Sequence, residues 1–194
     1  MDIRMVPVGQ LFEKMARIVR KTSRELGKKV TLKLLGTDTE LDKLIVEDLA
    51  DPLMHIIRNA IDHGIESPER RRIAGKNEQG TLILSSYQRG NHVVVEVSDD
   101  GAGIDLDKVR QKAFDQGLVR DLLTVSDQEA MELIFHPGFS TADQVTDISG
   151  RGVGMDVVRT NIAAVYGVVE VGSLPGRVTR FTITLQMTLA TITV

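Results

Sequence analysis

Apolar residues recur every three or four positions over much of the chain, which is the spacing of amphipathic helices. The stretch "PVGQLFEKMARIVRKTSRELGKK" shows this pattern and reaches Gly27, a residue type that commonly stops a helix. The pattern returns over residues 41–63, and Gly64 predicts the end of that helix. Because Pro52 follows Asp51 within it, the helix is expected to begin or restart there, with proline in its first turn. Shorter helices are predicted for "SPERRRIA", opened by Ser67 and Pro68, and for residues 105–116, 127–135 and 153–167.

Strand patterns separate these helices. "VTLKLLG", residues 30–36, predicts one strand, and the two β-rich runs that flank "RGN" within residues 80–101 predict an antiparallel hairpin. Residues 168–189 predict two closing strands. Residues 136–152 are rich in Gly, Ser, Thr, Asp and Pro, so they predict a long loop, which in a compact domain is usually functional or mobile. This mixed order favours an α+β fold, a two-layer sandwich with a mostly antiparallel sheet, over a doubly wound sheet.

Composition narrows the class of protein. The chain has 194 residues, enough for one domain with a full core, and its net charge of -3 gives no global reason to expect nucleic-acid binding. It has no cysteine, which excludes disulfides and thiolate metal sites. No apolar run approaches the ~20 residues of a membrane span, and the first residues lack the apolar core of a signal peptide. A cytoplasmic chain is the default expectation.

The stretch "MHIIRNAIDHGIE" places polar side chains on an otherwise apolar helix. His55, Asn59 and His63 are spaced by four, so they line one face. The asparagine carbonyl is a suitable ligand for a hard cation such as Mg²⁺, and histidine can donate to a phosphate or accept a proton. The same stripe is also typical of solvated polar residues or hydrogen-bonded core histidines. Zinc is disfavoured, because this histidine spacing without cysteine is not a usual zinc pattern.

Two glycine-containing motifs follow. Asp99, Gly101 and Gly103 come directly off a predicted strand, where a carboxylate could accept from an amine such as that of adenine and glycines let a flat ring come close. The alternative is a tight turn before a helix capped by Asp105. The second motif, "SGRGVGMDVV", opens a helix, whose first N–H groups can bind phosphate. It fails the dinucleotide fingerprint because Met155 stands where the last glycine should be, and loop flexibility remains the alternative.

Taken in order, these motifs resemble the ATP-binding domain shared by gyrase, Hsp90, histidine kinases and MutL. "HIIRNAIDHG" is similar to its N box, "DDGAG" to its G1 box, "LIFHPGFST" to its F box and "GRGVGMDVV" to its G2 box. A histidine before Arg-Asn-Ala-x-Asp-His-Gly, and "PGFST" followed by "SGRGVGMDVV", resemble the chemotaxis histidine kinases in particular. The resemblance implies the Bergerat fold over residues 7–187, the end of a linker from dimerisation helices over 1–6, and over 188–194 the start of a linker to an absent CheW-like regulatory domain.

The resemblance also implies roles for single residues. Asp99 would hold the adenine amine, Asn59 would coordinate Mg²⁺ with His63 beside it, and His55 stands where gyrase-like relatives carry a general-base glutamate. His55, Asn59 and Arg58 form the implied catalytic set. The implied nucleotide-binding set is Asn59, His63, Asp99, Gly101, Gly103, Lys108, Lys112, Ser140, Thr141, Gly150, Arg151, Gly152, Val153, Gly154, Met155 and Thr179, with Phe139 in the lid and Thr182 as a further candidate.

The chain departs from the family pattern in places. Gln144 stands where the lid often has a lysine, Val178 where the closing motif usually has glycine, and the exit reads "LQMT". These departures weaken the match to the closing motif, which is the third glycine motif of the family. The match to the first two glycine motifs stays intact.

The implied reaction moves the γ-phosphoryl group of Mg-ATP to a histidine nitrogen. None of the four histidines, His55, His63, His92 and His136, lies in a helix typical of a phosphoacceptor bundle, so the acceptor is expected on a separate domain. The implied partners are that domain, a CheW-like adaptor with its receptor, and a downstream response regulator. The isolated domain is expected to be a monomer, and the full-length protein a dimer. The alternatives are a gyrase-like ATPase, disfavoured by the histidine at position 55, and a nucleotide-binding switch or scaffold without kinase activity.

Overall fold

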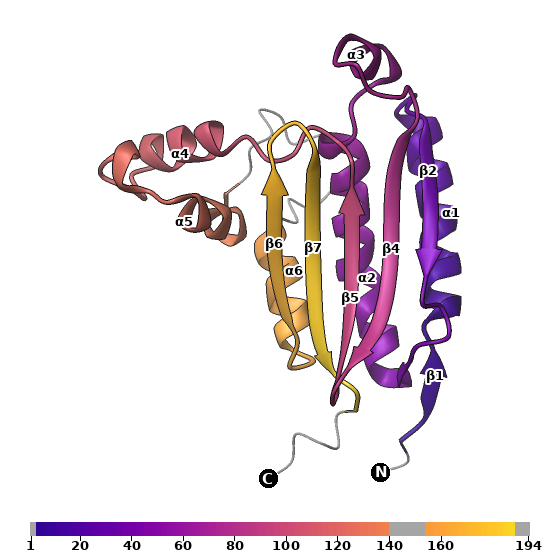
Figure 1. Cartoon of the computed structure of the whole chain (residues 1–194). Coiled ribbons are helices and arrows are strands. Elements are labelled where there is room, and N and C mark those ends of the chain that lie inside the picture. Colours follow the sequence, from indigo (N-terminus) through magenta and orange to yellow (C-terminus); the bar gives the residue numbers. More distant parts are fainter. Residues whose placement is uncertain (1–2, 140–153, 189–194) are drawn as a thin grey trace.

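The computed structural model describes residues 3–139 and 154–188 and forms two layers, a twisted sheet and the helices on one of its faces (Figure 1). The sheet has the strand order β2-β4-β5-β7-β6; β2 and β4 are parallel and all other neighbours antiparallel. Its strands are β2 (Val30–Leu35), β4 (Gly80–Arg89), β5 (His92–Asp99), β6 (Val168–Leu174) and β7 (Val178–Gln186). The helices against it are α1 (Gly9–Glu25), α2 (Lys43–Asn59) and α6 (Met155–Ala163). The predicted α+β sandwich is confirmed.

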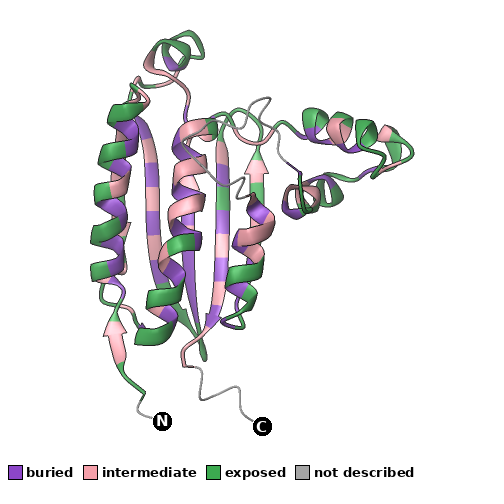
Figure 2. Ribbon diagram, turned by 180° about the vertical axis from the view of Figure 1, so that it is seen from behind, coloured by how far each residue is buried: buried purple, intermediate pink, exposed green. Residues whose placement is uncertain are grey.

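The core lies between the sheet and these helices, as the burial colours in Figure 2 show. Alternation along the strands decides which side chains enter it, because successive residues point to opposite faces. The sheet residues buried against the helices include Leu82, Leu84, Val93, Val95, Val97, Phe181, Ile183 and Leu185. Thr182 alternates with Phe181 and Ile183 and is paired with Glu96 and Glu170, so it lies on the other face of the sheet.

Helix α2 corrects the expectation for its start. Asp42 caps the helix by accepting a hydrogen bond from the Leu44 N–H at 3.0 Å, and Pro52 lies inside the helix rather than in its first turn. A proline in a helix interior loses one backbone hydrogen bond. Here the helix continues because it has a strong cap and buries an apolar face that includes Leu49, Leu53 and Ile56. Two three-residue strands that were not predicted, β1 (Met5–Pro7) and β3 (Glu40–Asp42), pair just before it.

The last turn of the second predicted helix is a π-helix, η1 (Ala60–Gly64). The Ile65 N–H donates to the Ala60 carbonyl at 2.7 Å, an i→i+5 bond that widens the turn. Lys28, just beyond α1, donates from Nζ to the carbonyls of Ile61 and Asp62, each at 2.7 Å. Such widened turns often occur at functional sites. The prediction that the helix ends at Gly64 is confirmed.

Helices α4 (Leu106–Asp115) and α5 (Asp127–Glu132), with two 3₁₀ turns, form a lobe beside the sheet with a small core of its own (Figure 1). The 3₁₀ turns are η2 (Leu122–Thr124) and η3 (Leu133–Phe135). Phe135 ties it to the main body, because its ring meets Phe181 edge-on and lies under the Arg159 guanidinium at 4.1 Å. The short helix α3 (Pro68–Ile73) follows η1 and is capped by Ser67, as predicted. None of the helices in the described ranges is long and apolar enough to span a membrane.

Candidate functional site

Asp99 ends strand β5 as a buried carboxylate, with the residue only 4% exposed. Its Oδ1 accepts a hydrogen bond from the Gly101 N–H at 2.9 Å, and Thr179 of β7 is its partner in the sheet register. Burial raises the pKa of Asp99 to about 6; the charges of Asp100 and Glu66 add to this, while the Gly101 N–H and Lys76 oppose it. Because a buried carboxylate is stabilised by each hydrogen bond that it accepts, Asp99 is suited to bind a hydrogen-bond donor of a ligand.

The loop after Asp99 passes directly against the end of the π-helix. The Ala102 N–H donates to the Gly64 carbonyl at 2.9 Å, and a Cβ atom on Gly101 would overlap that same carbonyl. Gly103 has φ +71°, and a Cβ atom there would come within 2.6 Å of the Leu174 carbonyl. These glycines are therefore required by close backbone contacts. Asp105 also caps α4, as the turn interpretation expected, so the turn and a ligand site are compatible.

Asn59 and Met155 contact each other although 96 residues separate them. The Asn59 amide nitrogen donates to the Met155 sulfur at 3.1 Å, and Met155 is the first residue of α6. The amide oxygen of Asn59 is then the atom left to accept from, or coordinate, a ligand. The glycine-rich motif thus meets the polar helix, as expected if the two act on one ligand.

The donor set fits a cation that arrives with its own oxygen ligands. In residues 3–139 and 154–188, no group of three or more His, Cys, Asp and Glu side chains could hold a metal ion. Mg²⁺ usually keeps several waters and binds through one or two protein ligands together with substrate phosphates. The Asn59 amide oxygen suits that arrangement, whereas a complete protein cage would not be possible with these residues.

The two histidines of this helix are in different environments. His55 is half-buried; burial and the nearby Arg58 charge lower its pKa more than Asp51 raises it, so its imidazole is neutral near pH 7. His63 lies in the π-turn, is half exposed, and has Nε2 3.5 Å from Asp62 Oδ2. A neutral imidazole can accept a proton, which is the role expected for the residue at position 55.

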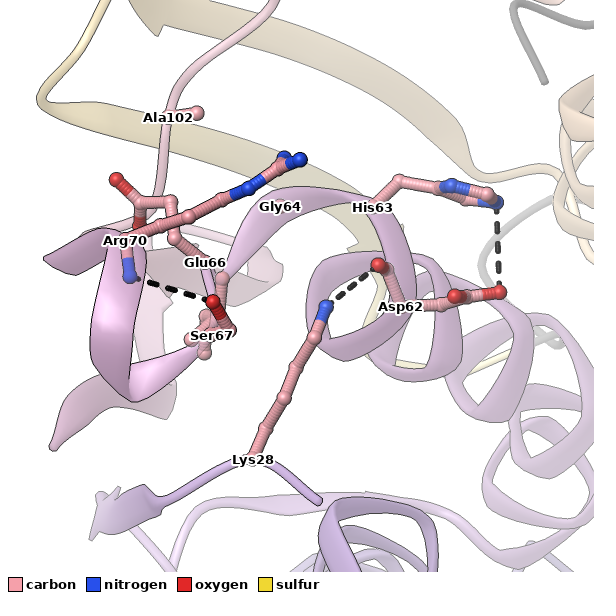
Figure 3. Close-up of a pocket in the computed structure, with 9 residues that line it drawn as sticks. Lys28, Asp62, His63, Gly64, Glu66, Ser67, Arg70 and Ala102 are labelled. Atoms are coloured by element: carbon pink, nitrogen blue, oxygen red, sulfur yellow. Dashed lines mark hydrogen bonds and ion pairs between the residues drawn. The ribbon is translucent and has the colours of Figure 1, made fainter. Parts of the chain in front are cut away.

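A cavity of about 230 Å³ opens beside the π-turn (Figure 3). Its lining contains Lys28, Asp62, His63, Gly64, Ile65, Glu66, Ser67, Arg70 and Ala102. Figure 3 shows Arg70 extending from α3 on one side and His63 on the other, with the Lys28 ammonium at the Asp62 carbonyl. Of the charged or titratable residues in this lining, the sequence analysis predicted only His63. Lys28, Glu66 and Arg70 belong to no local motif.

The two lysines predicted to reach the phosphates lie on α4, in the lobe. Lys108 is exposed, and its backbone N–H donates to the Asp105 cap. Lys112 places its ammonium 5.7 Å from the centre of the Phe139 ring, and Phe139 is buried in the small core of the lobe. Their contact with a phosphate therefore stays a prediction.

Further predicted residues fall outside the described ranges or need correction. Ser140, Thr141, Gln144, Gly150, Arg151, Gly152 and Val153 are not among the described residues, whereas Gly154 is described and is the N-cap of α6. Thr179 is buried next to Asp99, as a binding residue would be. Thr182 is wrong as a candidate, because strand alternation turns it to the opposite face of the sheet. Val178 begins β7 opposite Leu174, and its carbonyl accepts from Ser173 Oγ at 2.9 Å, so valine fits this strand position.

Comparison with known proteins gives relatives for the whole chain. A family profile described as "Histidine kinase-, DNA gyrase B-, and HSP90-like ATPase" matches residues 48–189. The "Chemotaxis protein CheA" of Bacillus subtilis is 47% identical over 100% of the chain and 29% of that protein's length. That of Salmonella typhimurium is 51% identical over 98% of the chain and 28% of its own length. The "Sensor histidine kinase CheAY" of Helicobacter pylori is 52% identical over 99% and 24%.

The chain thus spans less than a third of the length of these relatives. Among solved structures, the catalytic domain of histidine kinase ThkA has a TM-score of 0.59 at 16% identity, covering 98% of this chain and 99% of that one. At that identity the likeness shows the fold alone, and it agrees with the two-layer architecture.

Proposed function

The chain belongs to the family of histidine kinase-, DNA gyrase B- and HSP90-like ATPases, and we propose that it is the ATP-binding catalytic domain of a chemotaxis-type protein histidine kinase. In this role it binds Mg-ATP and transfers the γ-phosphoryl group to a histidine on a separate domain. The identity of 47–52% to two chemotaxis proteins and one sensor histidine kinase over essentially the whole chain supports this branch of the family. The contact of Asn59 with Met155 is the observation that most directly supports nucleotide binding, because it joins the polar helix to the glycine-rich motif.

The proposed placement of the nucleotide begins at Asp99. Its buried carboxylate accepts a hydrogen bond from the adenine amine, while Gly101 and Gly103 let the following loop pack closely against the Gly64 and Leu174 carbonyls. The Asn59 amide oxygen then faces the phosphates and their Mg²⁺. When bound, Mg²⁺ would neutralise part of the negative charge of the phosphates. This orientation leads the triphosphate toward the start of α6, where the N-terminal backbone of the helix favours anions.

Phosphoryl transfer to histidine needs no base to generate the nucleophile, because a neutral imidazole already has an unprotonated nitrogen. The unprotonated nitrogen of a neutral acceptor imidazole attacks the γ-phosphorus; a P–N bond forms, the bond to the β–γ bridging oxygen breaks, and ADP leaves. The phosphorylated ring then loses the proton on its other nitrogen. His55 is neutral near pH 7 because burial lowers its pKa, so it is the residue we assign to accept this proton. The rest of the rate acceleration comes from positioning ATP and the acceptor histidine.

The context of the domain follows from the same proposal. The acceptor domain, a CheW-like adaptor with its receptor, and a response regulator are partners of the longer protein, which would work in the cytoplasm as a dimer. The isolated domain would be a monomer. The printed names of the relatives, a chemotaxis protein and a sensor histidine kinase, support a signalling role for the longer protein.

A nucleotide-binding switch or scaffold is the second candidate, and transfer of phosphate separates it from the kinase. The test supplies γ-labelled ATP, Mg²⁺ and a purified histidine-containing acceptor domain from one of the chemotaxis relatives. The wild-type chain is expected to label the acceptor, and the Asp99→Asn variant is not. Binding of ATP without any labelling, when the relative's own catalytic domain labels the same acceptor, would favour the switch.

A further inference from the structure

A buried arginine lies outside the motifs of the family. Arg71 of α3 is 2% exposed, although arginine is almost never fully buried unless it is paired. Its Nε donates to the Asn77 carbonyl at 2.6 Å, and Nη1 donates to Glu66 Oε1 at 3.0 Å. Nη1 also reaches the Asp100 carbonyl at 3.1 Å, and Nη2 reaches Asp100 Oδ2 at 3.1 Å. The guanidinium is therefore directed at the loop that follows Asp99.

Lys76 reaches the same loop from the next turn of the chain. Its Nζ donates to Glu66 Oε2 at 2.8 Å, to the Asp100 carbonyl at 3.2 Å and to the Gly101 carbonyl at 2.8 Å. Glu66 thus bridges the two cations, one to each oxygen. Although burial raises the pKa of Glu66, the hydrogen bond from Lys76 and the charges of Lys76 and Arg71 lower it overall, so Glu66 is ionised. We call Glu66, Arg71 and Lys76 the loop clamp.

The loop clamp fixes the backbone that follows Asp99. It supplies two hydrogen bonds to the Asp100 carbonyl and one to the Gly101 carbonyl. With both carbonyls held this way, the Gly101 N–H faces back to Asp99 Oδ1. In addition, the Ala102 N–H donates to the carbonyl of Gly64 at the end of the π-turn. The loop is therefore held between two elements, and small shifts of either would move the Asp99 carboxylate.

We propose that Arg71 and Lys76 are positioning residues for nucleotide recognition, which hold the loop at residues 100–101 so that Asp99 meets the adenine amine. The inference rests on the proposed function, since it takes Asp99 as the adenine ligand. Neither cation touches the nucleotide itself in this arrangement; both act through the two loop carbonyls and through Glu66.

The loop clamp acts on Asp99 through its charges as well as through its geometry. The groups that shift the pKa of Asp99 are Asp100 and Glu66, which raise it, and Lys76, which lowers it. Nucleotide binding through Asp99 needs the ionised carboxylate. Removing Lys76 therefore raises the pH below which binding is lost. Removing the charge of Glu66 lowers that pH. A loss of stability alone would not shift the two variants in opposite directions.

The test is calorimetric titration with a non-hydrolysable ATP analogue and with its inosine counterpart, from pH 5 to pH 8. The Lys76→Met variant should bind the ATP analogue at least about tenfold more weakly, the loss typical of a charged hydrogen bond, and should discriminate less against inosine. Lys76→Arg should restore most of the affinity. Lys29→Met is the matched control, because Lys29 is an exposed lysine that pairs only at the surface with Glu78, its side chain being 62% exposed.

Unchanged affinity, base discrimination and pH limit in the folded Lys76→Met variant would overturn the inference. If that variant fails to fold, Glu66→Gln decides: a shift of the pH limit to lower values supports the loop clamp, and no shift overturns it. Asp99→Asn keeps the two proposals apart. If Asp99→Asn abolishes binding and Lys76→Met does not change it, only the loop clamp fails. If Asp99→Asn binds ATP like the wild type, the adenine placement itself fails.

Discussion

Replacing Asp99 by asparagine is expected to stabilise the nucleotide-free protein while it abolishes ATP binding. The substitution preserves the size of the side chain and the acceptor oxygen for the Gly101 N–H, so the loop keeps its hydrogen bond. What it removes is a negative charge that is buried at the end of β5, beside Asp100 and Glu66. A functional carboxylate at this place therefore has a cost in stability.

The magnitude follows from the pKa of Asp99, raised from 3.8 to about 6 in the folded protein, mainly by burial. A group whose folded pKa lies above its unfolded value contributes stability that is present below the unfolded pKa and is lost as the pH rises through the folded pKa. With about 1.4 kcal/mol for each pKa unit, ionised Asp99 costs on the order of 3 kcal/mol at pH 7. Below about pH 4 this cost disappears.

The assay is urea unfolding of wild type and Asp99→Asn without nucleotide, at pH 7.5 and at pH 4.5. The variant should be more stable at pH 7.5 by up to about 3 kcal/mol, and most of the difference should vanish at pH 4.5. Saturating Mg-ATP should stabilise the wild type, by about 2.7 kcal/mol at a hundredfold excess over Kd, and leave the variant unchanged. A variant that is less stable at pH 7.5, or a difference that does not depend on pH, would refute this reasoning.

Three further substitutions test the parts around Asp99. Gly101→Ala should lower the melting temperature and abolish binding of an ATP analogue, because its Cβ atom overlaps the Gly64 carbonyl; Gly172→Ala, where a Cβ atom meets nothing within 4 Å, should change neither. Lys28→Met should destabilise the protein by about 1–3 kcal/mol in urea unfolding, since it leaves the end carbonyls of the π-turn without their charged donor. His55→Gln should slow phosphotransfer about 100-fold or more while the Kd for the analogue stays within about twofold of wild type. Normal binding by Gly101→Ala, full stability of Lys28→Met, or an undiminished transfer rate in His55→Gln would each count against the role assigned to that residue.

Local patterns predicted most of the elements because their causes are local. The 3.6-residue repeat from Leu11 to Val19 comes from the face that α1 buries, and the alternation around "RGN" comes from a hairpin whose strands are adjacent in the chain. The start of α2 was predicted wrongly because proline is a strong local signal, whereas the competing cap at Asp42 and the burial of Leu49 depend on packing. The π-turn gave no signal of its own, since its sequence continues the helical pattern.

The candidate site divides in the same way. Asp99 and Asn59 were predicted from their motifs, and the structure brings Asn59 into contact with Met155 of the glycine-rich motif. Arg71, which the motifs did not indicate, acts on Asp100, 29 residues further along the chain, and Lys28 acts on residues more than 30 positions away. No local spacing encodes such contacts. From the sequence alone, a charged residue of this kind is interpreted as part of a solvated surface. Only the fold shows its buried contacts.

The central claim is that the chain binds Mg-ATP with adenine on Asp99, and calorimetric titration of an ATP analogue tests it most directly. The titration compares wild type and Asp99→Asn, each with and without Mg²⁺. The account predicts that wild type binds the analogue, that Mg²⁺ strengthens this binding, and that Asp99→Asn does not bind under either condition. Equal binding by both proteins, or no binding by the wild type, would contradict it.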